Sequence, residues 1–359
     1  MNDAGFLHDA AVLAARGIPR DTIIAIITDA WEPQVNGVVR TLGETRAQLE
    51  RLGYAVELIS PKDYRSLPCP TYPEIRLALS FPGAVGRRLK ELRPHAIHIA
   101  TEGPLGLAAR RYCVRTATPF TSAFHTQFPD YLARRTNLPP GVFWPYIRWF
   151  HRAARQTMVA TTSLADQLHA NGIERLHRWS RGVDLAQFSP DQTAPAEYNG
   201  LTGPILLYVG RIAVEKNLEA FLNSSYPGTR IVIGDGPAKP DLQQRFPDAK
   251  FLGARATSEL APYYAHADVF VFPSRTDTFG LVMIEALACG TPIAAFPVPG
   301  PADIVTDKCG ALSDDLDRAI DAARFSRQGD CVSRAKQFTW ERATRQFVNG
   351  LALEETGTP

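Results

Sequence analysis

The sequence predicts an α/β protein of two domains, each built on a parallel sheet. A chain of 359 residues, 45% of them hydrophobic, is longer than a typical single domain and can bury a sizeable core. Short runs of aliphatic residues alternate with amphipathic stretches, an order typical of parallel strands joined by helices. The alternation occurs twice, on either side of a polar stretch rich in proline and glycine at 184–204.

The strands of the two series are expected at 22–28, 55–60, 96–100 and 157–162, and at 205–210, 230–234, 268–273 and 292–296. A helix is expected after Gly37, because apolar residues from Val38 to Leu52 recur on one face and Gly53 then ends it. The stretch 184–204 should link the domains, and the amphipathic segment 338–351 should cross back onto the first domain. We therefore expect one domain at 1–190 together with a C-terminal helix at 338–359, and a second at 191–337.

The charge is unevenly distributed along the chain. Residues 1–187 hold 23 Lys and Arg against 16 Asp and Glu, whereas the remainder holds 16 against 21. The basic first half could meet an anionic surface. The five cysteines form no C-x-x-C pair, the first residues lack the pattern of a signal peptide, and no window is apolar enough to span a membrane. We expect a cytoplasmic protein whose contact with a membrane is peripheral.

The segment YVGRIAVEKN (208–217) predicts a phosphate site. Arg211 follows a strand and Gly210 directly, and Lys216 lies near the start of a helix. Two cations and a helix N-terminus at one point would stabilise the negative charge of a leaving diphosphate. The alternative is that both are solvated cations at the entry of a helix.

The segment SRTDTFGLVMIEALACGTPIAA (274–295) predicts paired carboxylates at one cleft. Asp277 stands eight positions before Glu285, and Gly280 lies in the turn that opens the helix. Glu285 could accept hydrogen bonds from ribose hydroxyls and Asp277 from sugar hydroxyls. The alternative is a capping aspartate followed by a solvated glutamate.

In this order the segments resemble the retaining GT-B glycosyltransferases of family 4. That family has an Asn-Gly-Val loop, matched by DAWEPQVNGVVR (29–40), and a Gly-Val-Asp at the domain crossover, matched by RGVDLAQFSP (181–190). It also has G-R-x-x-x-x-K, matched from Gly210 to Lys216, a G-D-G-P loop at 234–237, and an acidic residue separated from a glutamate by seven residues. The resemblance covers residues 22–345 and implies two facing Rossmann-like domains.

The donor site that the resemblance implies comprises Gly37, Gly210, Arg211, Lys216, Asp277, Phe279, Gly280, Leu281 and Glu285. The backbone of Gly37 would approach the phosphates, and Glu285 would hold the ribose. His125, in AFHTQFPDYL (123–132), matches the family histidine that faces the donor sugar; its alternative is a core histidine after a strand. With Arg211, Lys216 and Asp277 it forms the implied catalytic set. Many relatives have glutamate in place of Asp277, which leaves the sugar open.

The resemblance also implies retention of anomeric configuration, with no metal and no other cofactor. An Asp-x-Asp spacing occurs at Asp315 and Asp317, where a helix start is the better interpretation. The implied mechanism is a front-face transfer in which the leaving diphosphate helps to remove the proton of the acceptor.

The acceptor side is predicted from GVFWPYIRWFHRAAR (141–155), where aromatic residues alternate with arginines. Arg148, Trp149 and Arg152 are the candidate contacts with an anionic membrane surface, and the basic stretch 87–93 adds a second group. The alternative is a core helix with a solvated basic rim. We expect a lipid acceptor such as diacylglycerol and a UDP-hexose donor, UDP-glucose or UDP-glucuronate, at the inner face of the cytoplasmic membrane. The alternative is a GDP-mannose-dependent α-mannosyltransferase acting on a lipid-linked or polysaccharide acceptor.

Three other classes of protein are weighed against this one. A nicotinamide-dependent oxidoreductase would need G-x-G-x-x-G after an early strand, where the chain has TDAWEPQVNG. A sugar-nucleotide epimerase would share the diphosphate site and stays open as a second alternative. A nucleic-acid-binding protein would need a recognition module, and the basic residues are scattered without one. The expected partners are a nucleotide sugar and a lipid, not nucleic acid.

Overall fold

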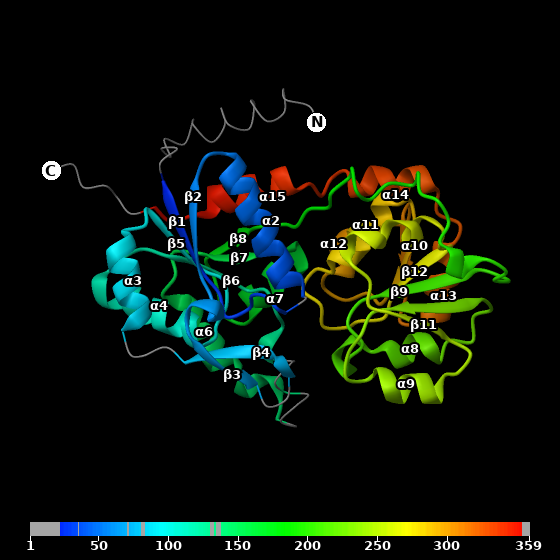
Figure 1. Ribbon diagram of the computed structural model, residues 1–359, viewed down its shortest axis with the longest axis horizontal. Coiled ribbons are helices and arrows are strands. Elements are labelled where there is room, and N and C mark those ends of the chain that lie inside the picture. The colour runs from blue at the N-terminus through cyan, green and yellow to red at the C-terminus, as the bar shows by residue number, and fades with distance from the viewer. Residues whose placement is uncertain are drawn as a thin grey trace. The chain divides into compact units, whose positions relative to one another are not determined.

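The computed structural model describes residues 22–34, 36–69, 72–79, 83–129, 133 and 138–353 (Figure 1). The chain folds as two compact units. Unit 1 contains the residues up to Ser180 and the segment from Trp340 onward, and unit 2 runs from Arg181 to Thr339.

Unit 1 is built on six parallel strands in the order β2-β1-β5-β6-β7-β8. They are β1 (Ile23–Ile27), β2 (Ala55–Ile59), β5 (Ala96–Ile99), β6 (Thr121–Ala123), β7 (Thr157–Val159) and β8 (Leu176–Arg178). An antiparallel pair, β3 (Arg65–Cys69) and β4 (Tyr72–Leu79), is inserted between β2 and β5. The central strand β1 is almost wholly buried, as its continuous aliphatic run predicts.

The helices of unit 1 are α2 (Gly37–Arg51), α3 (Ala84–Leu92), α4 (Pro104–Thr116), α6 (Trp144–Arg152), α7 (Thr162–Ala170) and α15 (Trp340–Gly350), with short 3₁₀ turns at Pro61–Asp63 and Pro140–Val142. Helix α2 confirms the helix predicted after Gly37. The Asn36 side chain accepts hydrogen bonds from the amides of Val38 and Val39, each at 3.0 Å, and so caps the helix. Leu42 and Leu49 are buried on its inner face.

The C-terminal helix α15 packs in unit 1, where the segment 338–351 was expected to cross back. The backbone amide of Ser180 donates to Oε1 of Gln346 at 2.7 Å. The ring of Phe347 lies 4.8 Å from that of Trp179 and 4.9 Å from that of His98. The end of the chain therefore completes the core of the first unit.

Unit 2 has six parallel strands in the order β11-β10-β9-β12-β13-β14. They are β9 (Ile205–Val209), β10 (Thr229–Ile233), β11 (Lys250–Gly253), β12 (Val269–Phe272), β13 (Ile293–Ala295) and β14 (Gly310–Leu312). The helices are α8 (Leu218–Leu222), α9 (Lys239–Arg245), α10 (Ala261–Ala265), α11 (Leu281–Ala288), α12 (Pro301–Ile304), α13 (Leu316–Ala323) and α14 (Gln328–Ala335), with 3₁₀ turns at Ala196–Tyr198, Val214–Lys216 and Thr257–Glu259.

The stretch 184–204, which its composition marks as a linker, lies within unit 2. Two aromatic residues anchor it there. The buried Tyr198 donates from its hydroxyl to the carbonyl of Tyr263 at 3.0 Å, and the buried Phe188 ring packs edge-on against Tyr264. The boundary between the two units lies between residues 180 and 181.

Candidate functional site

The strand order of unit 2 places two loops side by side. Strand β9 lies between β10 and β12, and the chain passes from β9 to β10 on one side before it returns to β12 on the other. Such a switch point leaves a crevice beyond the carboxyl ends of the two strands, where open α/β sheets bind ligands. The loop after β9 carries Arg211 and Lys216, and the loop after β12 carries Asp277.

The loop after β9 is held from two sides. A Cβ on Gly234 would lie 1.8 Å from the carbonyl oxygen of Gly210, and one on Gly236 would lie 2.3 Å from that of Ile212. Only glycine therefore allows the G-D-G segment to run against this loop. On the other side, the buried hydroxyl of Tyr208 donates to the carbonyl of Arg211 at 2.7 Å. Burial raises the pKa of Tyr208, so this donor stays protonated.

The two loops meet in an ion pair. Nζ of Lys216 lies 2.5 Å from Oδ1 of Asp277, and both side chains are about three-quarters buried. Lys216 ends a 3₁₀ turn directly before α8, which has only five residues. The helix whose N-terminus was expected at the site is therefore short and has a weak dipole. Any binding of phosphate here would depend mainly on side chains.

Two further hydrogen bonds tie the same loops together. Nδ2 of Asn217 donates to the carbonyl of Pro273 at 3.0 Å, and Oγ1 of Thr276 donates to the carbonyl of Glu215 at 3.3 Å. Residues about sixty positions apart in the sequence are thus fixed in one arrangement.

The second carboxylate oxygen of Asp277 is buried and has no hydrogen-bond partner among the residues that the structure describes. A buried acceptor without a partner costs about 1–3 kcal/mol, which a hydroxyl group of a ligand would recover. Asp277 is not a helix cap, because α11 begins after Gly280 and no side chain caps it. The capping alternative considered for Asp277 is therefore wrong.

Glu285 lies on α11 and is 1% exposed, so the alternative of a solvated helix glutamate is also wrong. Its Oε2 accepts a hydrogen bond from the hydroxyl of Tyr264 at 2.9 Å. Phe279 is buried against Phe338, with ring centroids 5.8 Å apart, so that only its main chain could face a donor.

Gly280 has a φ of +93°, and a Cβ there would lie 2.7 Å from Cε of Met283, which explains the glycine before Leu281. The structure thus gathers Gly210, Arg211, Lys216, Asp277, Phe279, Gly280, Leu281 and Glu285 on the loops and the helix that follow β9 and β12.

Gly37 and His125 belong to unit 1. Gly37 is the first residue of α2 and is exposed. His125 follows β6, is 8% exposed, and packs edge-on against Trp179 with ring centroids 5.3 Å apart. The approach of both residues to a donor stays a prediction.

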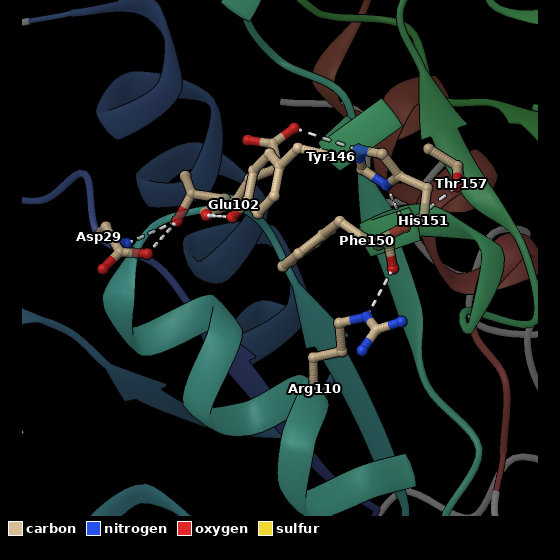
Figure 2. Close-up of polar contacts among 9 residues, drawn as sticks. Asp29, Glu102, Arg110, Tyr146, Phe150, His151 and Thr157 are labelled. Atoms are coloured by element: carbon tan, nitrogen blue, oxygen red, sulfur yellow. Dashed lines mark hydrogen bonds and ion pairs between the residues drawn. The ribbon is translucent and has the colours of Figure 1, made fainter. Parts of the chain in front are cut away.

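Helix α6 divides into two faces. Trp144, Ile147 and Phe150 are buried, whereas the three residues predicted to meet a membrane, Arg148, Trp149 and Arg152, are exposed. The guanidinium of Arg110 on α4 lies 3.8 Å from the centroid of the Trp149 ring. It also donates to the carbonyl of Trp149 at 2.7 Å and to that of Phe150 at 2.9 Å, and Figure 2 shows the second of these bonds. Within the described ranges no helix is both long and apolar enough to cross a bilayer.

The second basic group, at 87–93, lies beside acidic residues that offset part of its positive charge. Arg87 and Arg88 line an open pocket of about 520 Å³ together with three acidic residues, and Arg88 lies 3.5 Å from Glu57. The Asp-x-Asp pair marks a helix start, as predicted. The side chain of Asp315 accepts from the amides of Asp317 and Arg318 and caps α13.

Unit 1 also contains a buried polar network that the sequence analysis did not predict. It joins Glu102, Ser122, His151 and Thr157, which come from four separate segments and form no motif (Figure 2).

Two parallel α/β sheets and a cationic loop at a switch point define a two-domain enzyme of the GT-B class. The chain belongs to the glycosyltransferases of family 4. Residues 35–187 match the model of Glycosyltransferase Family 4, and residues 203–325 match that of Glycosyl transferases group 1. The protein is thus a glycosyltransferase.

The chain is 32% identical to a sulfoquinovosyl transferase of Arabidopsis thaliana over 81% of its own length and 59% of that relative. It is 31% identical to a GDP-mannose-dependent alpha-mannosyltransferase of Mycobacterium tuberculosis, over 79% of this chain and 81% of the relative. An alpha-monoglucosyldiacylglycerol synthase of Streptococcus pneumoniae is 27% identical, over 80% and 74%. Sucrose-phosphate synthase from Thermosynechococcus elongatus shares the fold, with a TM-score of 0.69 at 22% identity, covering 91% of this chain and 97% of that one.

Removing the hydroxyl that donates to Glu285 should destabilise unit 2. In Tyr264→Phe the buried carboxylate loses this donor, and we expect the free energy of unfolding to fall by about 1–3 kcal/mol in urea titrations. The control is Tyr226→Phe, whose hydroxyl bonds to Asp321 at the surface and should change stability by less than about 0.5 kcal/mol. Equal losses in the two variants would contradict the account of Glu285.

Proposed function

We propose that the protein is a retaining glycosyltransferase that moves a hexose from a UDP-hexose, UDP-glucose or UDP-glucuronate, to diacylglycerol at the inner face of the cytoplasmic membrane. The observation that carries the proposal is the ion pair of Lys216 and Asp277 at the crevice of unit 2, with one Asp277 oxygen left without a partner in the described chain. A cation beside an open acceptor suits a ligand that carries phosphate next to sugar hydroxyls.

The two cations of this loop would bind the diphosphate. Each charge-assisted hydrogen bond to phosphate contributes roughly 1.5–3 kcal/mol, and the bonds strengthen as the leaving group gains charge. Asp277 would hold Lys216 in place and accept a hydrogen bond from the sugar. Glu285 would bind the ribose once the donor reaches α11.

The proposed transfer occurs on one face of the sugar. The bond between the anomeric carbon and the phosphate oxygen breaks as the acceptor oxygen bonds to the same face of that carbon. The proton of the acceptor hydroxyl passes to the departing phosphate, so that no metal or other cofactor is required. His125 and Gly37 would contribute from unit 1.

The lipid acceptor is supported by a surface on α4 and α6. Neither helix contains an acidic residue. Their exposed residues include Arg111, Val114 and Arg115 on α4 and Arg148, Trp149 and Arg152 on α6. Each arginine near an anionic bilayer contributes about 1 kcal/mol, and Trp149 suits the headgroup region. The name of the pneumococcal relative, a glucosyldiacylglycerol synthase, points to the same acceptor.

A second candidate is transfer of mannose from GDP-mannose to a lipid-linked or polysaccharide acceptor. It is favoured by the mycobacterial relative, of which the chain covers 81% at 31% identity. Both candidates use the same diphosphate site and differ in the sugar that meets Asp277.

Incubation with a panel of nucleotide sugars tests the donor. With vesicles of phosphatidylglycerol and dioleoylglycerol, mass spectrometry should find hexosyl-diacylglycerol from a UDP-hexose. Lys216→Ala should lower kcat/KM at least tenfold, because one charge-assisted bond exceeds the 1.36 kcal/mol of a tenfold change. Lys250→Ala, an exposed lysine on β11, is the control.

Three outcomes would contradict parts of this proposal. If product forms only from GDP-mannose, the donor is GDP-mannose and not a UDP-hexose. If Lys216→Ala keeps the wild-type kcat/KM, the assignment of the diphosphate site is rejected. An altered sugar nucleotide formed without acceptor would indicate an epimerase.

Reversing two charges on α6 tests the membrane surface. Arg148→Glu combined with Arg152→Glu should weaken co-sedimentation with phosphatidylglycerol vesicles at least tenfold at low salt, since each arginine contributes about 1 kcal/mol. The control is Lys308→Glu with Arg327→Glu, two exposed cations of unit 2. Equal binding by both double variants would reject this surface.

A further inference from the structure

Unit 1 has a switch point of its own. Strand β1 lies between β2 and β5, and the chain passes from β1 to β2 before it returns on the other side to β5. The loops after β1 and β5 therefore lie side by side at the carboxyl edge, the place where such sheets bind ligands. Two carboxylates stand there, Asp29 after β1 and Glu102 after β5.

The carboxylate of Asp29 is fully engaged within the fold. Its Oδ1 accepts from the amide of Leu105 at 2.8 Å, and its Oδ2 accepts from the Thr101 hydroxyl at 2.8 Å and the Gly106 amide at 3.3 Å. These bonds cap the first turn of α4, whose N-cap glycine has no side chain. Asp29 is therefore a structural carboxylate.

Glu102 differs from Asp29. It is 8% exposed, and its Oε1 lies 3.2 Å from Nε2 of His151 (Figure 2). Its Oε2 has no hydrogen-bond partner within the part of the chain that the structure describes. Its carbonyl accepts from the Tyr146 hydroxyl at 2.5 Å, which fixes the main chain. Burial, with the nearby carboxylates of Glu102 and Asp29, raises the pKa of Tyr146 to about 12, so this donor keeps its proton.

The hydrogen bonds behind His151 allow an order of donors that ends on Glu102. Nδ1 of His151 lies 2.8 Å from Oγ of Ser122, which lies 3.1 Å from Oγ1 of Thr157. If Thr157 donates to Ser122 and Ser122 donates to Nδ1, the ring proton is on Nε2 and points to Glu102. In this order Nε2 of His151 donates to Oε1 of Glu102. The carboxylate is thus held in one rotamer by a single donor.

We propose that Glu102 binds a hydroxyl group of the acceptor through its Oε2, and that His151 positions it. A nine-tenths buried carboxylate with one protein donor leaves acceptor capacity unused, and a hydroxyl is the donor that every glycosyl acceptor carries. This inference rests on the proposed function only in assigning the acceptor to unit 1.

The variant Glu102→Gln tests it, because the amide oxygen can still accept from His151 while the charge and the second acceptor oxygen are lost. The assay uses UDP-glucose and GDP-mannose with phosphatidylglycerol vesicles that contain dioctanoylglycerol and phosphatidylinositol, and with glycerol in the buffer. We expect the ratio of glycosylated product to free sugar to fall at least tenfold. The KM for the donor and the rate of donor hydrolysis should change less than twofold.

Two controls separate binding of the acceptor from support of the fold. Glu57→Gln, an exposed residue 3.5 Å from Arg88, should leave the ratio unchanged. Ser122→Ala removes the donor to His151 and should lower the Tm more than Glu102→Gln does, with a smaller effect on the ratio. A Glu102→Gln variant that loses transfer and hydrolysis equally, or that keeps the wild-type ratio, would overturn the proposal.

The same assay tests the proposed diacylglycerol acceptor separately from the role of Glu102. If sugar is transferred only to phosphatidylinositol or glycerol, diacylglycerol is rejected as the acceptor, and the ratio measured on the new product still tests Glu102. Transfer to none of the three compounds would contradict both proposals.

Discussion

The order of strands in the two parallel sheets is the constraint on which the sites depend. In each sheet the chain leaves a central strand on one side and returns on the other. Two loops distant in sequence must then lie next to each other, because neighbouring strands are only about 4.8 Å apart. The pairing of Lys216 with Asp277 and the position of Asp29 and Glu102 at the same edge of their sheet follow from this topology. Short loops tied by backbone hydrogen bonds keep the positions fixed.

Stability alone does not account for the carboxylates at these edges. A partly buried ion pair contributes little to the stability of the fold, since the cost of desolvating the two charges offsets much of their attraction. Asp277 carries the further cost of a buried oxygen that no group in the described chain satisfies. Such a cost persists in a fold when a bound ligand removes it. Asp29 differs from Asp277, because both of its carboxylate oxygens are used in capping a helix.

The long aliphatic strands and α2 could be predicted because their patterns are local. Strands β6 and β8 were not predicted, since neither contains a run of aliphatic residues: β6 is Thr-Ser-Ala and β8 is Leu-His-Arg. Tertiary contacts make them strands, and the buried Ser122 is satisfied by His151 rather than by its neighbours. The linker assignment for 184–204 failed for a similar reason, as Phe188 and Tyr198 outweigh the surrounding proline and glycine.

Each donor loop could be predicted because it contains a local motif, Arg211 with Lys216 in one and Asp277 with Glu285 in the other. The network of Glu102 was not predicted, because its members are up to 55 positions apart, from Glu102 to Thr157, and share no spacing. A glutamate in T-E-G-P has no local feature that predicts burial beside a histidine. Only the strand order brings these residues together.

Helix α6 connects the two proposals for unit 1. Its buried face carries His151, which orients Glu102, and its exposed face carries Arg148, Trp149 and Arg152. In the proposed binding mode, a lipid surface would contact the exposed face of the same nine-residue helix that carries His151. Arg110 strengthens this link, since it stacks on Trp149 and bonds to the carbonyl of Phe150. Under the two proposals, contact with the membrane and orientation of the acceptor hydroxyl would depend on the same nine residues.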